Sequence, residues 1–246
     1  SRVRNRAIDG VAQIGSDAEE LMGALIGALE DADAVVRQSA ARSLGEFKEG
    51  ASDASTGLVR LLADESSDVR IAAAEAIGKI GLASEQDAAA TTIKALTALL
   101  ADKDTPAVLA ALRTLAELGT DARSSISRLV ELLEHREPTV RAAVSESLPK
   151  IEDNVEQLVP LLIQSLRDDE WTVRKSAAGA LGEIGAPAKG AVPVLFELLA
   201  SEQDRDAARD ALRSIDAVSP EAIPTLIKAL ETGDSRTKYY AVFYLG

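Results

Sequence analysis

The 246-residue sequence has no cysteine and a single histidine. Without cysteine there can be no disulfide, thiolate nucleophile, zinc finger or iron–sulfur cluster, and a metal site with two histidines is also excluded. Aromatic residues make up only 3% of the chain, so alanine and leucine supply most of its apolar surface. These two residues favour helices, whereas sheets favour β-branched and aromatic residues. The composition therefore predicts an all-α fold.

The sequence also lacks long apolar runs and an excess of positive charge. No apolar run approaches the roughly 20 residues that span a bilayer, and the start "SRVRNRAIDG" has no apolar signal core. The net charge of −13 would repel a polyanion such as nucleic acid. We therefore expect neither a membrane nor a nucleic acid as a partner. The absence of cysteine leaves the compartment open, with the cytoplasm slightly favoured.

The chain repeats itself about every 33 residues. Val-Arg pairs, or weaker copies of them, begin at positions 3, 36, 69, 107, 140, 173, 204 and 237. The steps between them are 33, 33, 38, 33, 33, 31 and 33 residues. A fixed period in this range is typical of repeat arrays. We count positions within each repeat from these starts, which are position zero.

Each repeat contains two predicted helices. Positions four, eight and eleven are apolar in nearly every copy, as in Ala177, Leu181 and Ile184, and form one stripe along a helix that we call helix B. Leucines four residues apart mark a preceding helix A. Glycine follows helix B in four copies, at Gly15, Gly81, Gly119 and Gly185. A left-handed residue commonly ends a helix at such a position.

Neither helix can bury its apolar stripe alone, so neighbouring pairs must share a continuous core. We expect an all-α fold, an α-solenoid of stacked antiparallel helix pairs. It should form a single domain over residues 1–246, with about seven pairs and an extra helix B at the front. We expect the array to be truncated at one or both ends.

Three motifs resemble the HEAT-repeat family, in particular the short HEAT-like repeats of phycobilin lyase subunits. They are "DADAVVR", "AAGALGEIG" and a proline within helix A at Pro160, Pro193 and Pro224. The resemblance implies a right-handed superhelix with helices B on its concave face and helices A on its convex face. It implies little about activity, because such repeats serve many functions.

No group of residues forms a recognisable catalytic, cofactor or metal site, and we do not expect an enzyme. Arginine recurs at position one, as Arg37, Arg70, Arg141 and Arg174. A row of arginines can bind anions, but residues that follow the repeat usually define the scaffold. We interpret them as structural, bound to turn carboxylates or carbonyls of neighbouring repeats. His135 has no partner for catalysis or metal binding, and we interpret it as a solvated turn residue.

Positions two, six and ten of helix B form a column that differs from repeat to repeat, which we call the variable column. Constant positions specify the fold, whereas variable ones are available for recognition. Ile71 and Leu109 are apolar where solvent is expected. Trp171, the only tryptophan, lies at the rim of the variable column, where it either contacts a partner or caps the neighbouring turn. The candidate partner-binding residues are Arg42, Ile71, Glu75, Leu109, Arg113, Trp171, Lys175, Tyr239 and Phe243.

The main functional hypothesis is a non-enzymatic scaffold that binds a protein or peptide along helices B. One alternative, from the resemblance alone, is a lyase-type or chaperone subunit that handles a tetrapyrrole. Another is an engineered repeat binder, although the uneven steps of 38 and 31 residues favour a natural chain.

The C-terminal segment "RTKYYAVFYLG" holds all three tyrosines and Phe243. Tyr239 and Phe243 fall in the variable column, and Tyr240 and Tyr244 fall where other repeats have small residues. We expect end-to-end self-association through this helix, or cover by a partner. The alternative is that the aromatic side chains fold over the final core as a cap.

Overall fold

The computed structural model describes residues 18–47, 51, 53–215, 223–233 and 235–245, and these residues contain helices and no strand. The elements are α2 (Ala18–Ala28), α3 (Ala34–Glu46), α4 (Ser55–Leu61), α5 (Ser67–Ile80), α6 (Gln86–Leu99), α7 (Thr105–Leu118), η2 (Gly119–Ser125), α8 (Ile126–Leu132), α9 (Pro138–Ile151), α10 (Val155–Ser165), α11 (Trp171–Ile184), η3 (Ala186–Ala191), α12 (Val192–Leu198), α13 (Arg205–Ile215), α14 (Ile223–Thr232) and α15 (Ser235–Leu245). The predicted all-α repeat architecture is confirmed.

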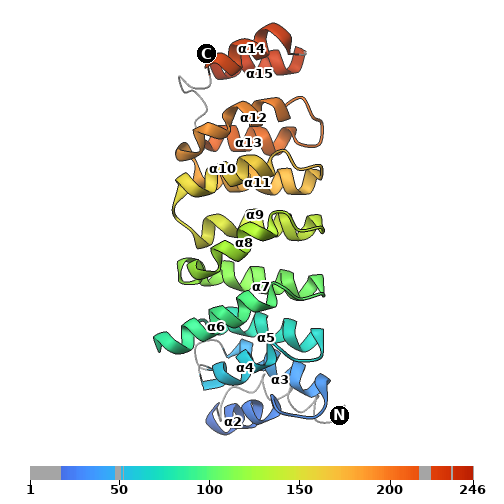
Figure 1. The fold of residues 1–246 in the computed structure, drawn as a ribbon, viewed down its shortest axis with the longest axis vertical. Helices are drawn as coiled ribbons and strands as arrows, with labels where there is room; N and C mark the ends of the chain where they lie inside the picture. The colour runs from blue at the N-terminus through green and yellow to red at the C-terminus, as the bar shows by residue number, and fades with distance from the viewer. Residues whose placement is uncertain (1–17, 48–50, 52, 216–222, 234, 246) are drawn as a thin grey trace. The chain divides into compact units, whose positions relative to one another are not determined.

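The chain divides into two compact units, Ser1–Arg128 and Leu129–Gly246. In the first unit, α3 packs on α5 and α5 packs on α7. In the second, α9 packs on α11 and α11 packs on α13 (Figure 1). The sequence prediction of a single domain stays a prediction, and each unit is described here by itself.

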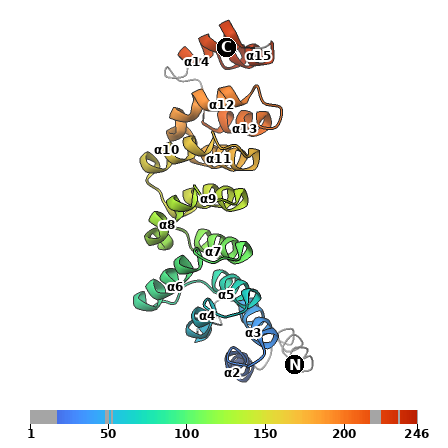
Figure 2. The same ribbon diagram turned by 45° about the vertical axis from the view of Figure 1, so that its right-hand side comes forward.

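Each unit has two layers of helices. Figure 2 shows α4 and α6 on one side of the first unit and α3, α5 and α7 on the other. In the second unit, α10 and α12 lie across from α11 and α13. The helices of the first layer are the predicted helices A, and those of the second layer are the predicted helices B. The apolar stripes of both layers meet between them.

Helix α11 shows how one repeat is built. Val173, Ala177 and Leu181 are buried with at most 1% of their surface exposed, so the predicted stripe faces the core. The helix ends at Gly185, whose φ of 72° is left-handed. Gly81 and Gly119 have the same role, with φ of 84° and 61°. The predicted glycine ends are thus confirmed, except for Gly15, which lies outside the described residues.

Helix α3 approaches α5 closely at Gly45. A Cβ atom there would lie 3.1 Å from Ala76 Cα and 3.3 Å from Ala76 Cβ. Gly45→Ala should therefore lower the free energy of unfolding by about 1 kcal/mol, because overpacking outweighs the gain in helix propensity. Gly27 in the last turn of α2 has open space around its Cβ position, so Gly27→Ala should raise the same quantity by up to about 0.5 kcal/mol, less than in a helix interior. Urea denaturation of both variants measures the two changes in the free energy of unfolding, which should have opposite signs. Changes of the same sign would contradict the close approach of α3 and α5 at Gly45.

Candidate functional site

The position-one arginines bind carboxylates of the next repeat. Arg141 donates from Nε and Nη2 to the two carboxylate oxygens of Asp168, each at 2.7 Å. Its Nη1 donates to the carbonyl oxygens of His135 and Arg136, at 2.7 and 3.2 Å. We call the four contacts of this kind the inter-repeat bridges. They are Arg37–Asp64, Arg70–Asp102, Arg141–Asp168 and Arg174–Asp204.

Three of the four aspartates, Asp64, Asp102 and Asp168, also accept a hydrogen bond from the backbone N–H two residues further on in their own turn. Asp168 Oδ1 accepts a hydrogen bond from the backbone N–H of Glu170 at 2.9 Å. The hydrogen bonds from Arg141 lower the pKa of Asp168 against the opposing effect of burial. For Asp64, burial alone would raise the pKa, but the hydrogen bonds from Arg37 and from the backbone N–H of Ser66 lower it overall. The bond to Asp168 in turn raises the pKa of Arg141.

The structural interpretation of the arginine series is therefore confirmed, and these arginines are not an open anion site. Their partners lie 27 to 32 residues further along the chain. His135 is half-buried rather than solvated, and its Nδ1 accepts from the backbone N–H of Glu137 at 3.1 Å. It thus occupies a turn as predicted, in the place that other repeats give to the bridging aspartate.

The first unit presents a variable column whose charges are largely paired. Arg113 lies 3.9 Å from Glu75, and Lys79 donates to Glu46 at 2.6 Å. Arg42 is exposed. The expectation that Ile71 and Leu109 face solvent is corrected, because both are half-buried. This face therefore carries no pronounced apolar surface at these two positions.

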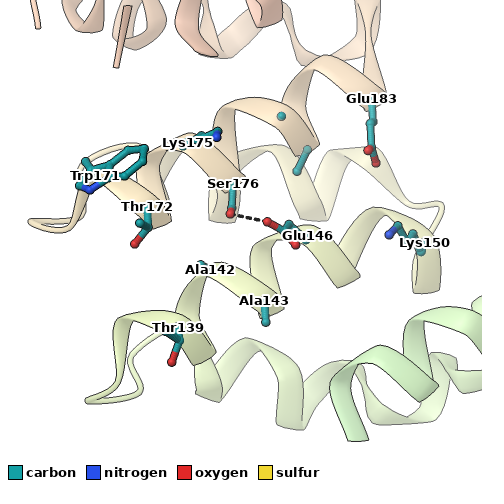
Figure 3. A pocket seen from close by; sticks show the side chains of 12 residues that line it. Thr139, Ala142, Ala143, Glu146, Lys150, Trp171, Thr172, Lys175, Ser176 and Glu183 are labelled. Carbon is teal, nitrogen blue, oxygen red and sulfur yellow. Dashed lines mark hydrogen bonds between the residues drawn. The ribbon is translucent and has the colours of Figure 1, made fainter. Parts of the chain in front are cut away.

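The second unit has a groove along its variable column, between α9 and α11. Its volume is about 590 Å³. Figure 3 shows Trp171, Lys175 and Glu183 on one side, from α11, and Glu146 and Lys150 on the other, from α9. Thr139, Ala142, Ala143, Thr172, Ser176, Gly179 and Ala180 complete the lining. Two predicted residues, Trp171 and Lys175, thus lie in one hollow.

Two positions of the variable column at the groove hold small residues. Gly179 stands at position six, where the first unit has Arg113, and nothing lies within 4 Å of the place for its Cβ. Ala142 stands at position two, where other repeats have Ile71 and Leu109. A helix-interior glycine costs about 0.5–1 kcal/mol relative to alanine. The open space at Gly179 is thus obtained at the expense of helix stability.

The walls of the groove are held by specific contacts. Lys175 Nζ lies 5.7 Å from the ring centroid of Trp171, which is 39% exposed. At this distance the ammonium and the ring attract one another. Glu146 on α9 accepts a 2.6 Å hydrogen bond from the hydroxyl of Ser176 on α11 (Figure 3). The groove therefore joins one amphipathic aromatic surface to a row of exposed charges.

The remaining predicted residues lie on the last helix pair, α14 and α15. Tyr239 and Phe243 are 64% and 65% exposed. Tyr244 is buried instead, and its ring lies edge-on to that of Phe196, 5.8 Å away. The alternative of an aromatic cap therefore describes Tyr244, whereas Tyr239 and Phe243 are exposed.

Sequence reasoning missed most of the groove. Glu146, Lys150, Gly179 and Glu183 belong to the variable column, but the column alone does not distinguish them from their counterparts. The available signal was the coincidence of Ala142 and Gly179 in adjacent repeats beside the only tryptophan. Within the described ranges, no cluster of three or more potential metal-binding side chains occurs. None of the described helices has the length and apolar character of a membrane span.

Comparison with known families identifies the repeats. A family model described as HEAT repeats matches residues 1–78, 24–116, 55–148 and 126–216. The comparison with curated proteins found no match.

Solved structures show the same fold. One similar chain comes from a structure in which Kap95p binding induces the switch loops of RanGDP to adopt the GTP-bound conformation. The match to that chain has a TM-score of 0.67 and 16% identity, over 92% of this chain and 34% of that one. Computationally designed armadillo repeat proteins for modular peptide recognition give a TM-score of 0.53 and 23% identity, over 78% and 99%. The complex of CpcE and CpcF of phycocyanin lyase from Nostoc sp. PCC7120 gives a TM-score of 0.48 and 24% identity, over 93% of this chain and 89% of that one. At these identities the likeness of the first two structures concerns the fold alone.

Proposed function

Because the chain belongs to the HEAT-repeat family, we propose that it is a non-enzymatic scaffold that binds an extended segment of another protein in the groove between α9 and α11. The groove itself is the observation that carries this proposal. Its volume of about 590 Å³ lies within the roughly 300–1,000 Å³ typical of ligand sites. The family supplies the general expectation of protein binding, and the groove supplies a place for it.

The lining suggests how a segment would be held. Trp171 offers a partly exposed ring of the kind enriched at interface hot spots. Ala142 and Gly179 let a main chain come close to the groove floor. Lys150 and Glu183 are exposed at the far end and offer one charge of each sign to polar groups of the segment. The predicted residues of the first unit are proposed as secondary contacts for a longer partner.

Gly179→Arg tests the groove, because it restores the long side chain that Arg113 provides at the equivalent position. Peptides selected from a displayed random library on the unmodified chain should bind Gly179→Arg at least about tenfold more weakly, a loss of about 1.4 kcal/mol. Fluorescence of Trp171 reports the binding directly, since the chain has no other tryptophan.

Gly27→Arg is the matched control. It makes the same substitution in the last turn of α2, where the Cβ position is also open. Gly179→Arg should gain about 0.5–1 kcal/mol of stability, because glycine is replaced in a helix interior, and Gly27→Arg should gain less than that. Selected peptides that bind Gly179→Arg and the unmodified chain equally would contradict the groove as the site.

Haem tests the tetrapyrrole alternative. The absorption spectrum of haem should stay unchanged when the chain is added, and a saturable shift of that spectrum would favour the alternative.

A further inference from the structure

The charges of the variable column alternate in sign from one repeat to the next, except at Gly179. From the helix α3 to the helix α13, position six holds Arg42, Glu75, Arg113, Glu146, Gly179 and Asp210. Over the same helices, position ten holds Glu46, Lys79, Glu117, Lys150, Glu183 and Ser214. The alternation at position six predicts a positive side chain between Glu146 and Asp210, and the chain has glycine there.

In the first unit this alternation produces ion pairs between neighbouring helices B. At position six, Arg113 Nη2 lies 3.9 Å from Oε1 of Glu75. At position ten, Lys79 Nζ lies 2.6 Å from Oε1 of Glu46. Side chains at the same position of stacked helices therefore face one another, and opposite charges there compensate one another.

The two ends of the groove in the second unit follow the same principle. Figure 3 shows Lys150 and Glu183 at one end of the groove, where they bring one charge of each sign from α9 and α11. At the other end, the ammonium of Lys175 lies 5.7 Å from the ring centroid of Trp171. The positive charge of Lys175 is thus placed against the negative face of an aromatic ring.

The middle of the groove is different, because Glu146 lies across from a glycine. Both Glu146 and Gly179 line the groove, and nothing lies within 4 Å of the place for a Cβ atom at Gly179. Within the described part of the chain, no lysine or arginine forms an ion pair with Glu146. Position six of this groove therefore combines an uncompensated carboxylate with open space.

The carboxylate of Glu146 is already oriented within the groove. Its Oε1 accepts a 2.6 Å hydrogen bond from the hydroxyl of Ser176 on α11. An ionised carboxylate can accept about four hydrogen bonds, so this contact leaves most of its capacity for a ligand. A group that is held in place before binding loses less entropy when the ligand arrives.

We propose that the segment bound in this groove presents an arginine, whose guanidinium fills the space at Gly179 and pairs with Glu146. This inference rests on the proposed function and adds the chemistry of the partner. Arginine is favoured over lysine because both positive residues at position six, Arg42 and Arg113, are arginines. The planar guanidinium can also donate two parallel hydrogen bonds to one carboxylate.

The charge around the groove favours the same partner. The next helix of the second unit, α13, packs on α11 and has Asp206 and Asp210 at positions two and six. These two carboxylates share a single cation, Arg209, at 2.9 and 3.4 Å. With a net charge of −13 over the whole chain, long-range attraction also guides a positively charged segment towards it.

A peptide with a neutral arginine analogue tests the pair. Peptides selected on the unmodified chain should share an arginine at one place. Replacing that arginine by citrulline, which has the same shape without the charge, should weaken binding about three- to tenfold. Glu146→Gln should weaken the arginine peptide by a similar factor, and it keeps an acceptor for Ser176. The citrulline peptide should bind the parent and Glu146→Gln equally, because the two changes remove one interaction.

Glu197→Gln is the matched control. Glu197 is an exposed carboxylate on α12, in the other layer of the same unit, so this variant changes the net charge equally and should bind the arginine peptide like the parent. Fluorescence anisotropy of labelled peptides measures the affinities, and equal melting temperatures of the two variants show that both are folded.

The outcomes separate this inference from the proposed function. Selected peptides that lose affinity for Gly179→Arg but contain no shared arginine, or that bind Glu146→Gln like the parent, would overturn the inference and leave the groove as the site. Lysine in place of the shared arginine would likewise overturn it. Peptides that bind Gly179→Arg unchanged, or a chain that selects none, would overturn the proposed function and this inference together.

Discussion

Phe196→Ala should lower the free energy of unfolding of the second unit by about 3–5 kcal/mol. Phe196 is the largest fully buried side chain among the described residues, with 1% of its surface exposed. It lies in the core cluster that joins α12 to α13 and α15, and its ring supports that of Tyr244. Its removal leaves a cavity and also withdraws the support of the last helix pair. Urea denaturation followed by circular dichroism measures the loss.

Phe243→Ala is the matched control for this prediction. It removes the same ring from α15, where Phe243 is 65% exposed and lies outside the core cluster. A surface substitution of this kind is usually worth within about 0.5 kcal/mol. A loss below about 1 kcal/mol for Phe196→Ala would show that α15 does not depend on Phe196 for its packing.

Asp168→Ala should cost about 3 kcal/mol, because it leaves the guanidinium of Arg141 buried without its carboxylate. The side chains of Arg141 and Asp168 are 15% and 14% exposed. The substitution also removes the acceptor for the backbone N–H of Glu170. Glu30→Ala breaks an ion pair of 3.0 Å with Arg60 whose side chains are about two-thirds exposed, and should cost less than about 0.5 kcal/mol. Equal losses in the two variants would contradict a special role for the inter-repeat bridge.

The same bridge makes stability depend on acid. The folded chain lowers the pKa of Asp168, so the unfolded chain binds this proton more tightly than the folded one. The electrostatic contribution of the bridge is fully present above the unfolded pKa of about 3.9 and is lost as the pH falls through the lower, folded pKa. The stability gap between the parent and Asp168→Asn should therefore narrow below about pH 4. A gap that is constant from pH 7 to pH 3 would contradict this assignment.

The sequence predicts the helices and their ends well because each depends on local chemistry that recurs. The stripe of Val173, Ala177 and Leu181 follows from the helical period alone. The end of the helix follows from Gly185, which can adopt the left-handed conformation. The bridges are harder to predict, since Arg141 meets Asp168 only after two repeats are stacked. Their structural nature follows from periodicity, but the identity of the partner does not.

The groove and the last helix pair show why the rest could not be predicted. The groove is lined by the small residues Ala142 and Gly179, and a search for conspicuous residues gives no weight to small ones. Ile71 and Leu109 appeared exposed because their positions face outward on an isolated helix, but the neighbouring repeats partly cover them. Tyr240 and Tyr244 occupy adjacent turns of one stripe, yet only the tertiary packing reveals that Tyr244 is the buried one.

The inter-repeat bridges also bear on how such a chain can evolve. They use arginine forks, turn carbonyls and turn aspartates, whereas Ala142, Lys175 and Gly179 line the groove from the faces of helices B. None of the four described bridges uses a groove residue, so substitutions in the groove leave these contacts intact. Mutational drift is limited mainly by the stability threshold of the fold. Natural selection can therefore change the lining of the groove by a few substitutions without disturbing the inter-repeat bridges.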